Sequence, residues 1–330
     1  MKVRTFIIFL IAILVAGCSA PKKNITVLKP PRVESVAGIK KIAVLPFKGD
    51  KSITYVIEAK LNNITINGKK YFQLVSRTEL DKVLSEVNFQ ESGLAEKVVE
   101  YGKILGVQGI ITGFAKPSYW INSFKEKRQK CIRYEDHKCK AYRDVYVLCK
   151  RIKAQYVLIP KILKIPTGEI VYSREIKKSD YSKYCYGDHT QPVSYLDMID
   201  RLKEEAVNEF IEDIAPHQTV ISIKFKDDDD DIKDRKAKEL FNKGLEFLEN
   251  QDLEKACQFF EKAYQKYSDS ISILYNLGAC QEIKGNLKEA LEYYTKAYDK
   301  LSKPDKDIQN AIYRVKTRIK EREKLKRVLN

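Results

Sequence analysis

Apolar positions in the first half of the chain follow two spacings. Continuous apolar runs of strand length predict buried strands at residues 40–47, 71–75 and 107–114. Apolar side chains at helical spacing predict helices over residues 53–66, 80–87 and 93–105. Ser76 and Glu79 have the capping-box spacing at the start of the middle helix, where each side chain can bond the other's backbone amide. Strands and helices alternate, which indicates an α/β fold.

A strongly amphipathic helix over residues 193–214 and a strand over 220–225 follow. They complete an α/β domain that we expect to span residues 38–226. Five consecutive aspartates then repel one another and are not expected to pack. Residues 227–234 are therefore predicted to be an acidic linker.

The C-terminal part of the chain repeats itself. Small and aromatic residues recur about 34 residues apart, at Gly244 and Gly278, Ala256 and Ala290, Phe260 and Tyr294, and Ala263 and Ala297. This is the tetratricopeptide (TPR) helix–turn–helix pattern, in which small residues let paired helices approach closely. We expect two TPR repeats over residues 235–303 and a basic capping helix over 304–330. Two helical hairpins whose spacing coincides by chance remain the alternative.

A concave face is expected along the first helices of the repeats. The side chains predicted to line this groove are Phe241, Asn242, Tyr275 and Asn276. They are the expected binding site for a protein partner.

The start of the chain reads as an export signal. Lys2 and Arg4 precede an apolar run that is too short for the roughly 20 residues of a spanning helix. The ending Val15-Ala16-Gly17-Cys18 resembles a bacterial lipobox, in which the cysteine is lipidated and becomes the first residue of the mature chain. We expect a signal peptide over residues 1–17, a lipid anchor on Cys18 and a tether over 18–37. An ordinary signal peptide with a chance cysteine and an uncleaved anchor remain open.

The net charge of +16 arises from 61 Lys and Arg against 45 Asp and Glu. Such a surplus suggests a nucleic acid or an anionic membrane surface as partner. Export argues against nucleic acid, so the charge is expected to face anionic headgroups, polyanionic envelope polymers or acidic proteins. Ser19 after the lipidated cysteine favours the periplasmic side of the outer membrane.

Two long strands, over residues 145–163 and 169–181, are predicted to form a hairpin around a Pro166-Thr167-Gly168 turn. If Ile165 faces Glu169 across that turn, the same register places Cys149 opposite Cys185. An extra residue in either strand would shift every pair.

Cysteines of an exported protein favour disulfides over metal ligands. We expect Cys149–Cys185 and Cys131–Cys139. A zinc site that includes His137 is the alternative, although the cysteine spacings match no standard metal pattern. Cys257 and Cys280, in the repeats, are expected to be buried small apolar residues.

The sequence offers no catalytic arrangement. The three histidines, His137, His189 and His217, have no nucleophile at a recognisable spacing, and the chain lacks a phosphate-binding or dinucleotide-binding motif. We therefore expect no catalytic residue, no metal and no cofactor.

The first domain resembles the CsgG-like (curli production assembly/transport component) lipoproteins. The resemblance rests on the order of Lys41-Ile42-Ala43-Val44-Leu45-Pro46-Phe47, Phe72 to Leu80, Gly102 to Phe114, and Thr167 to Val171. It implies an α/β domain with a mixed sheet and a long β-hairpin, built for assembly or protein binding and without catalytic residues.

These observations favour a non-enzymatic envelope scaffold that is lipid-anchored, recruits a protein through its repeats and can form homo-oligomers. The alternative is a curli-type secretion channel subunit, whose lipid-facing strands must alternate apolar and polar residues. Residues 123–143 carry charged side chains at both odd and even positions, so both faces of a strand there would be charged, which disfavours the channel. An envelope hydrolase is a third class and has no supporting residue.

Overall fold

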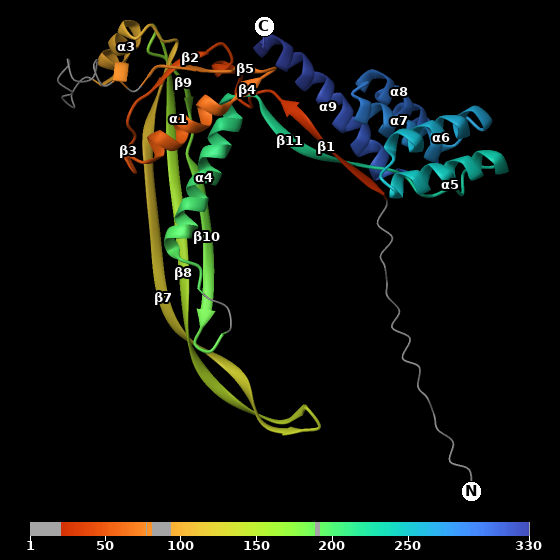
Figure 1. Cartoon of the computed structure of the whole chain (residues 1–330), viewed down its shortest axis with the longest axis horizontal. Coiled ribbons are helices and arrows are strands. Elements are labelled where there is room, and N and C mark those ends of the chain that lie inside the picture. Colours follow the sequence, from red (N-terminus) through yellow and green to blue (C-terminus); the bar gives the residue numbers. More distant parts are fainter. Residues whose placement is uncertain (1–20, 77, 81–93, 189–191, 330) are drawn as a thin grey trace. The chain divides into compact units, whose positions relative to one another are not determined.

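A computed structural model of the protein describes residues 21–76, 78–80, 94–188 and 192–329. The chain divides into two compact units. Pro30–His217 forms an α/β unit, called the sheet unit below, and the chain up to Lys29 joins Gln218–Leu329 in a second unit, called the helical unit. The predicted fold class is confirmed, since a mixed sheet with a long β-hairpin is followed by a run of helices (Figure 1).

A mixed sheet forms the centre of the sheet unit. Its main strand order is β10-β8-β7-β2-β6, while β3 pairs with β7 and β9 with β8. The strands are β2 (Lys41–Val44), β3 (Lys48–Gly49), β6 (Gln73–Leu74), β7 (Gly109–Glu135), β8 (Lys138–Lys164), β9 (Ile170–Ser173) and β10 (Ile176–Cys185). Strand β2 runs parallel to β6 and β7, whereas β7, β8 and β10 form an antiparallel meander.

Helices cover both faces of the sheet near its β2 end. On one face, Ile111 and Ile162 lie in the same apolar cluster as Ile214 of α4 (Tyr195–Ile214). On the other face, Ile110 packs in a cluster with Val98 of α3 (Leu94–Ile104). Also in this unit are η1 (Glu34–Val36), α1 (Ile53–Asn63), and the small β4 (Thr65–Ile66) and β5 (Lys69–Lys70) hairpin.

Helix α4 follows β8 and β10 along the sheet, as the amphipathic pattern predicts (Figure 1). Its N-cap is Ser194, whose hydroxyl accepts a bond from the amide of Leu196. Its buried side chains recur at helical spacing, at Met198, Leu202, Ala206 and Phe210. The sequence therefore fixes which side of this helix faces the sheet.

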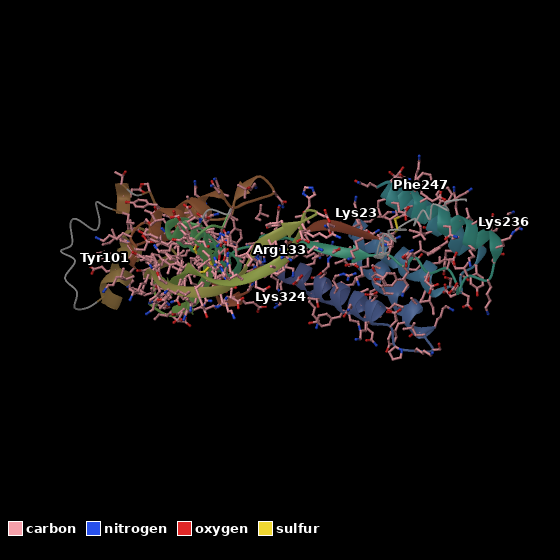
Figure 2. The ribbon with its side chains drawn as sticks, turned by 90° about the horizontal axis from the view of Figure 1, so that it is seen from below. Lys23, Tyr101, Arg133, Lys236, Phe247 and Lys324 are labelled. Carbon is pink, nitrogen blue, oxygen red and sulfur yellow. A yellow bond between two sulfur atoms is a disulfide. The ribbon has the colours of Figure 1, made fainter. Side chains whose placement is uncertain are left out.

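Helices dominate the second unit. They are α5 (Arg235–Glu249), α6 (Leu253–Lys266), α7 (Ile271–Lys284), α8 (Leu287–Asp299) and α9 (Lys306–Leu329). The recurring glycines lie where helices cross, because a Cβ on Gly244 would stand 2.6 Å from the ring of Phe260, and one on Gly278 2.7 Å from that of Tyr294. The 34-residue repeat of small and aromatic residues is therefore explained by close packing of the paired helices. Lys236 on α5 and Lys324 on α9 belong to the charged exterior of these helices (Figure 2).

The segment expected to be a tether is partly structured. Strand β1 (Lys22–Lys29) pairs with β11 (His217–Lys224), and Ile25 packs against the core of the helical unit. The tether prediction is wrong for these residues, since they form a paired strand in which Ile25 packs against the core. Strand β11 also belongs to the helical unit from Gln218 onward, not to the α/β domain as expected.

Three predictions concern residues outside the described ones. They are the signal peptide, lipidation of Cys18 and most of the helix over 80–87. The start of that helix is described, and its capping box is confirmed. The amide of Glu79 donates to Ser76 Oγ at 3.3 Å, and the amide of Ser76 donates to a carboxylate oxygen of Glu79 at 3.3 Å. None of the described helices has both the length and the apolarity that crossing a bilayer requires.

Candidate interaction surfaces

A serine and a lysine, a pair that some enzymes use as nucleophile and base, lie in contact at the start of α1. Lys203 Nζ lies 2.9 Å from Ser52 Oγ and 3.0 Å from a carboxylate oxygen of Asp50. Burial favours a raised pKa for Asp50, but hydrogen bonds from Ser52, Tyr156 and Lys203 outweigh it and lower that pKa. The carboxylate and the amine thus form an ion pair at the start of α1. The cluster instead ties α1 to α4 and β8.

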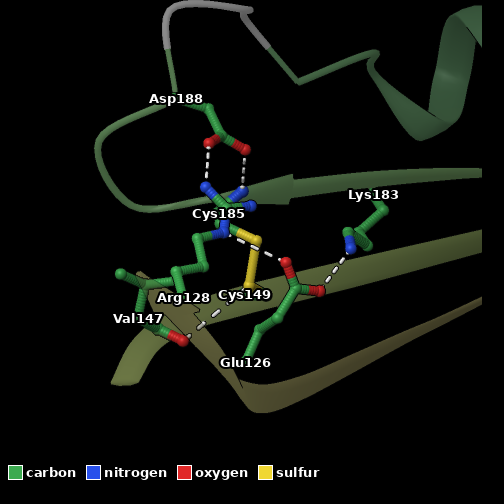
Figure 3. The surroundings of a disulfide bond; sticks show 7 residues. All are labelled: Glu126, Arg128, Val147, Cys149, Lys183, Cys185 and Asp188. Carbon is green, nitrogen blue, oxygen red and sulfur yellow. Dashed lines mark hydrogen bonds and ion pairs between the residues drawn. A yellow bond between two sulfur atoms is a disulfide. The ribbon is translucent and has the colours of Figure 1, made fainter. Parts of the chain in front are cut away.

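A second cluster has the composition of a metal site. Ligand atoms of Glu126, Cys149 and Cys185 lie within 4.8 Å of one another. The two cysteines are joined in a disulfide, so neither offers a thiolate, and Glu126 forms ion pairs with Lys183 and Arg128. This cluster braces the sheet (Figure 3).

The Cys149–Cys185 bond closes the three-stranded part of the sheet. Both cysteines are buried, and they face each other in the β8–β10 register, with Cα atoms 3.9 Å apart. The expected disulfide is present, but the pairing assumed at the turn is not. Near the turn Leu163 faces Ile170, and the β-bulge between Ile162 and Leu163 then shifts the pairing by one residue, into the register that brings Cys149 opposite Cys185. Beyond it, Asp188 accepts a bond from the amide of Cys185 at 2.8 Å and pairs with Arg128 at 2.5 Å, which fixes the end of β10 to β7 (Figure 3).

The second expected disulfide, Cys131–Cys139, lies near the tip of the β7–β8 hairpin. Its Cα atoms are 5.9 Å apart. Asp136 and His137 form the turn with φ of 50° and 58°, as a two-residue type I′ turn requires. All four cysteines of the sheet unit are thus in disulfides, and the zinc alternative is wrong for them.

Beyond Cys149, β7 and β8 continue as a two-stranded ribbon, here called the hairpin arm (residues 125–148). The arm extends past the ends of β10 and α4 (Figure 1). Cross-strand register and alternation place three exposed apolar side chains on one face, Tyr142 at 59%, Tyr146 at 69% and Leu148 at 54% exposure. Arg133 lies near the tip (Figure 2).

The predicted groove of the repeats is filled by the chain itself. Phe241, Tyr275 and Asn276 are 0%, 1% and 0% exposed. The side chain of Asn276 accepts a bond from the amide of Lys226 at 2.8 Å and donates one to its carbonyl at 2.9 Å. Phe225 is buried with its ring 6.1 Å from that of Phe260. The prediction that these side chains are available to a partner is wrong.

The aspartate run is packed as well, so the linker prediction fails for part of it. Asp231 accepts bonds from the amides of Ile271 and Ser272 at the start of α7, where a carboxylate is favoured. Asp229 accepts a bond from Asn242 at 2.9 Å and pairs with Lys238 at 3.0 Å. Asn242, the fourth predicted groove residue, is exposed but engaged by this contact. Mutual repulsion of the aspartates is offset by these donors.

Two buried features of the helical unit were not predicted as such. Cys257 and Cys280 are buried as expected, but they form a disulfide between α6 and α7. Glu282 is 0% exposed, and it pairs with Arg314 at 2.7 Å and Arg318 at 2.9 Å, both on α9. The hydroxyl of Tyr294 donates to the same carboxylate at 3.0 Å, and burial, followed by this carboxylate, raises the pKa of Tyr294 well above its usual value.

Comparison with known proteins gives the following matches. Residues 242–321 match the family described as Domain of unknown function (DUF6340). No curated protein matches. Two similar solved structures are the LpoB C-terminal domain from Salmonella enterica (14% identity, 44% of this chain and 95% of that chain, TM-score 0.24) and lipoprotein GNA1162 from Neisseria meningitidis (11%, 52% and 97%, TM-score 0.23).

Proposed function

We propose that this chain is a non-enzymatic envelope lipoprotein that serves as a docking scaffold for another protein. The signal peptide over residues 1–17 is removed, Cys18 carries the lipid, and the body lies on the periplasmic side of the outer membrane. Three disulfides support an oxidising compartment outside the cytoplasm. The scaffold combines a CsgG-like docking domain with TPR-like helical repeats and a basic capping helix, and it can self-associate.

The hairpin arm is the observation that carries the proposal. It is braced by Cys149–Cys185 at its base and Cys131–Cys139 near its tip, so its shape is set before any partner binds. Large aromatic side chains on a preformed surface are the usual anchors of protein interfaces. An arm of two strands offers such a surface but no enclosed cleft for catalysis.

The groove of the repeats is not the docking surface in this proposal. Three of its predicted contacts are buried, and Asn276 is bonded to the backbone of Lys226, so a partner would first have to displace parts of this chain. The exposed Tyr142 and Tyr146 need no such rearrangement. We therefore assign partner docking to the hairpin arm.

The channel alternative is disfavoured by the same arm. Alternation places Lys125 and Lys127 on one face and Arg128 and Lys130 on the other. Burying cations of either face in hydrocarbon costs about 2–4 kcal/mol each near the bilayer centre.

The proposal is tested by in-cell cross-linking and pull-down of the full chain. Replacing Tyr142→Ser together with Tyr146→Ser should lower recovery of the cross-linked partner at least about tenfold, since interface aromatics commonly contribute 2 kcal/mol or more. The matched control makes the same change at the exposed Tyr298 and Tyr313 of the helical unit. An equal partner set from wild type and the arm variant would contradict the proposal.

A further inference from the structure

The face of the sheet opposite α4 is uncovered where β7, β8 and β10 run together. We call it the basic face, and it is formed by Lys116, Trp120, Arg151, Lys153, Lys177 and Tyr181. Their neighbours in β8, Ala154 and Tyr156, are 0% exposed because they point to the face that α4 covers. Within the described part of the sheet unit, the helix that packs along these strands is α4, on the opposite face.

One row of the basic face joins all three strands. Trp120 pairs with Lys153, and Lys153 pairs with Tyr181. Both aromatic side chains are exposed, Trp120 at 48% and Tyr181 at 67%, and Lys153 Nζ lies 5.9 Å from the centre of the nearer Trp120 ring. The row therefore presents two large amphipathic rings with a cation between them.

The charge of this face has one sign over the four rows on which the inference rests; two rows beyond them, Glu126 lies on the same face and pairs with Lys183. Over the four cross-strand rows from Lys116 to Asn122, all within described strands, the face carries Lys and Arg side chains but no Asp or Glu. Repulsion between like charges disfavours a second copy of the same face as its cover. An anionic surface is the complementary partner.

We propose that the basic face lies on an anionic lipid bilayer. Trp and Tyr concentrate at the headgroup level of membranes, where one end of the ring is apolar and the other is wet. Lys and Arg near anionic headgroups each strengthen such binding about fivefold. An acidic protein would satisfy the charges, but the aromatic rings between the cations favour an interface with lipid. The inference rests on the sheet alone and needs neither lipidation of Cys18 nor the docking role of the arm.

The chain supplies its own probe, because it contains a single tryptophan, Trp120. The full chain is reconstituted into vesicles of phosphatidylcholine, alone or mixed with phosphatidylglycerol, that contain lipids with brominated acyl chains. The anionic vesicles should shift the emission of Trp120 to the blue and quench it, and added salt should reverse both effects. Arg151→Gln with Lys153→Gln should lower the ratio of docked to undocked faces about 30-fold.

The matched control is Lys125→Gln with Lys150→Gln, which removes the same charge from the opposite side of the ribbon. This variant should keep the wild-type quenching. Equal quenching in neutral and anionic vesicles, or equal losses from the two variants, would overturn the inference. Emission that responds to soluble polyglutamate but not to vesicles would also overturn it and would assign the face to an acidic protein. Loss of the cross-linked partner in the arm variant tests the docking role separately.

Discussion

In the helical unit, the buried carboxylate of Glu282 is held by two arginines and a tyrosine, and the buried side chain of Asn276 is bonded to the backbone of Lys226. In the hairpin arm, most side chains are exposed, and two disulfides fix a ribbon that has no core of its own. A two-stranded ribbon is marginally stable by itself, so covalent links replace packing there. The difference lies in what holds each part: the helical unit pairs the buried side chains of Glu282 and Asn276 internally, while the arm has Tyr142 and Tyr146 exposed on a ribbon that disulfides brace.

The largest effect is expected at Glu282. Glu282→Gln removes the charge that compensates Arg314 and Arg318, and breaking a buried ion pair in this way costs about 3–5 kcal/mol. The unfolding transition of the helical unit should move to lower denaturant, and that of the sheet unit should not. Urea titration followed by circular dichroism measures both transitions.

Glu289→Gln on α8 is the matched control, because Glu289 is exposed. It should leave the transition within about 0.5 kcal/mol of wild type. A similar loss in both variants would show that Glu282 contributes nothing beyond its surface charge.

A smaller effect is expected from the base of the arm. Cys149→Ser with Cys185→Ser opens a link between residues 36 apart, which costs about 2–4 kcal/mol. The loss should fall on the sheet unit, and amides of β10 near Lys183 should exchange faster with solvent. Hydrogen exchange measured by mass spectrometry locates the segments that lose protection. Cys131→Ser with Cys139→Ser is the control, and it should lose less because its loop is only 8 residues. If α5 to α8 lose protection in the Cys149→Ser, Cys185→Ser variant and β10 does not, this disulfide does not stabilise the sheet unit as expected.

The sequence predicts the Cys149–Cys185 disulfide from a hairpin register, although the pairing assumed at the turn differs by one residue from that in the structure. The strands near the turn pair one residue away from the assumed register, with Leu163 opposite Ile170, and the bulge between Ile162 and Leu163 supplies the shift that brings Cys149 opposite Cys185. The capping box is predictable because its contacts lie within one helical turn.

The contacts of the helical unit are harder to predict, because they depend on how separate helices pack. From the sequence, Asp231 is expected only to repel the neighbouring aspartates. In the folded chain it accepts hydrogen bonds from the amides at the start of α7. Cys257 and Cys280 look like isolated apolar residues until α6 and α7 bring them together. The repeat pattern predicts the helices, but it does not predict that the segment after β11 bonds to α7.

The smallest of these effects is expected at Asn276, which holds the backbone of Lys226 by two hydrogen bonds and is itself buried. Asn276→Ala leaves the half-buried amide and carbonyl of Lys226 without these partners, which costs about 1–3 kcal/mol. The amide of Lys226 should lose its protection from exchange, and proteases should cut within the aspartate run faster than in wild type. Asn242→Ala is the control, because its exposed side chain holds only Asp229, and it should change neither rate appreciably. If Asn276→Ala leaves both rates unchanged, Phe225 alone holds the segment in place. The groove would then be closed by apolar packing, as an ordinary core is, and the contrast with the hairpin arm would rest on burial more than on polar pairing.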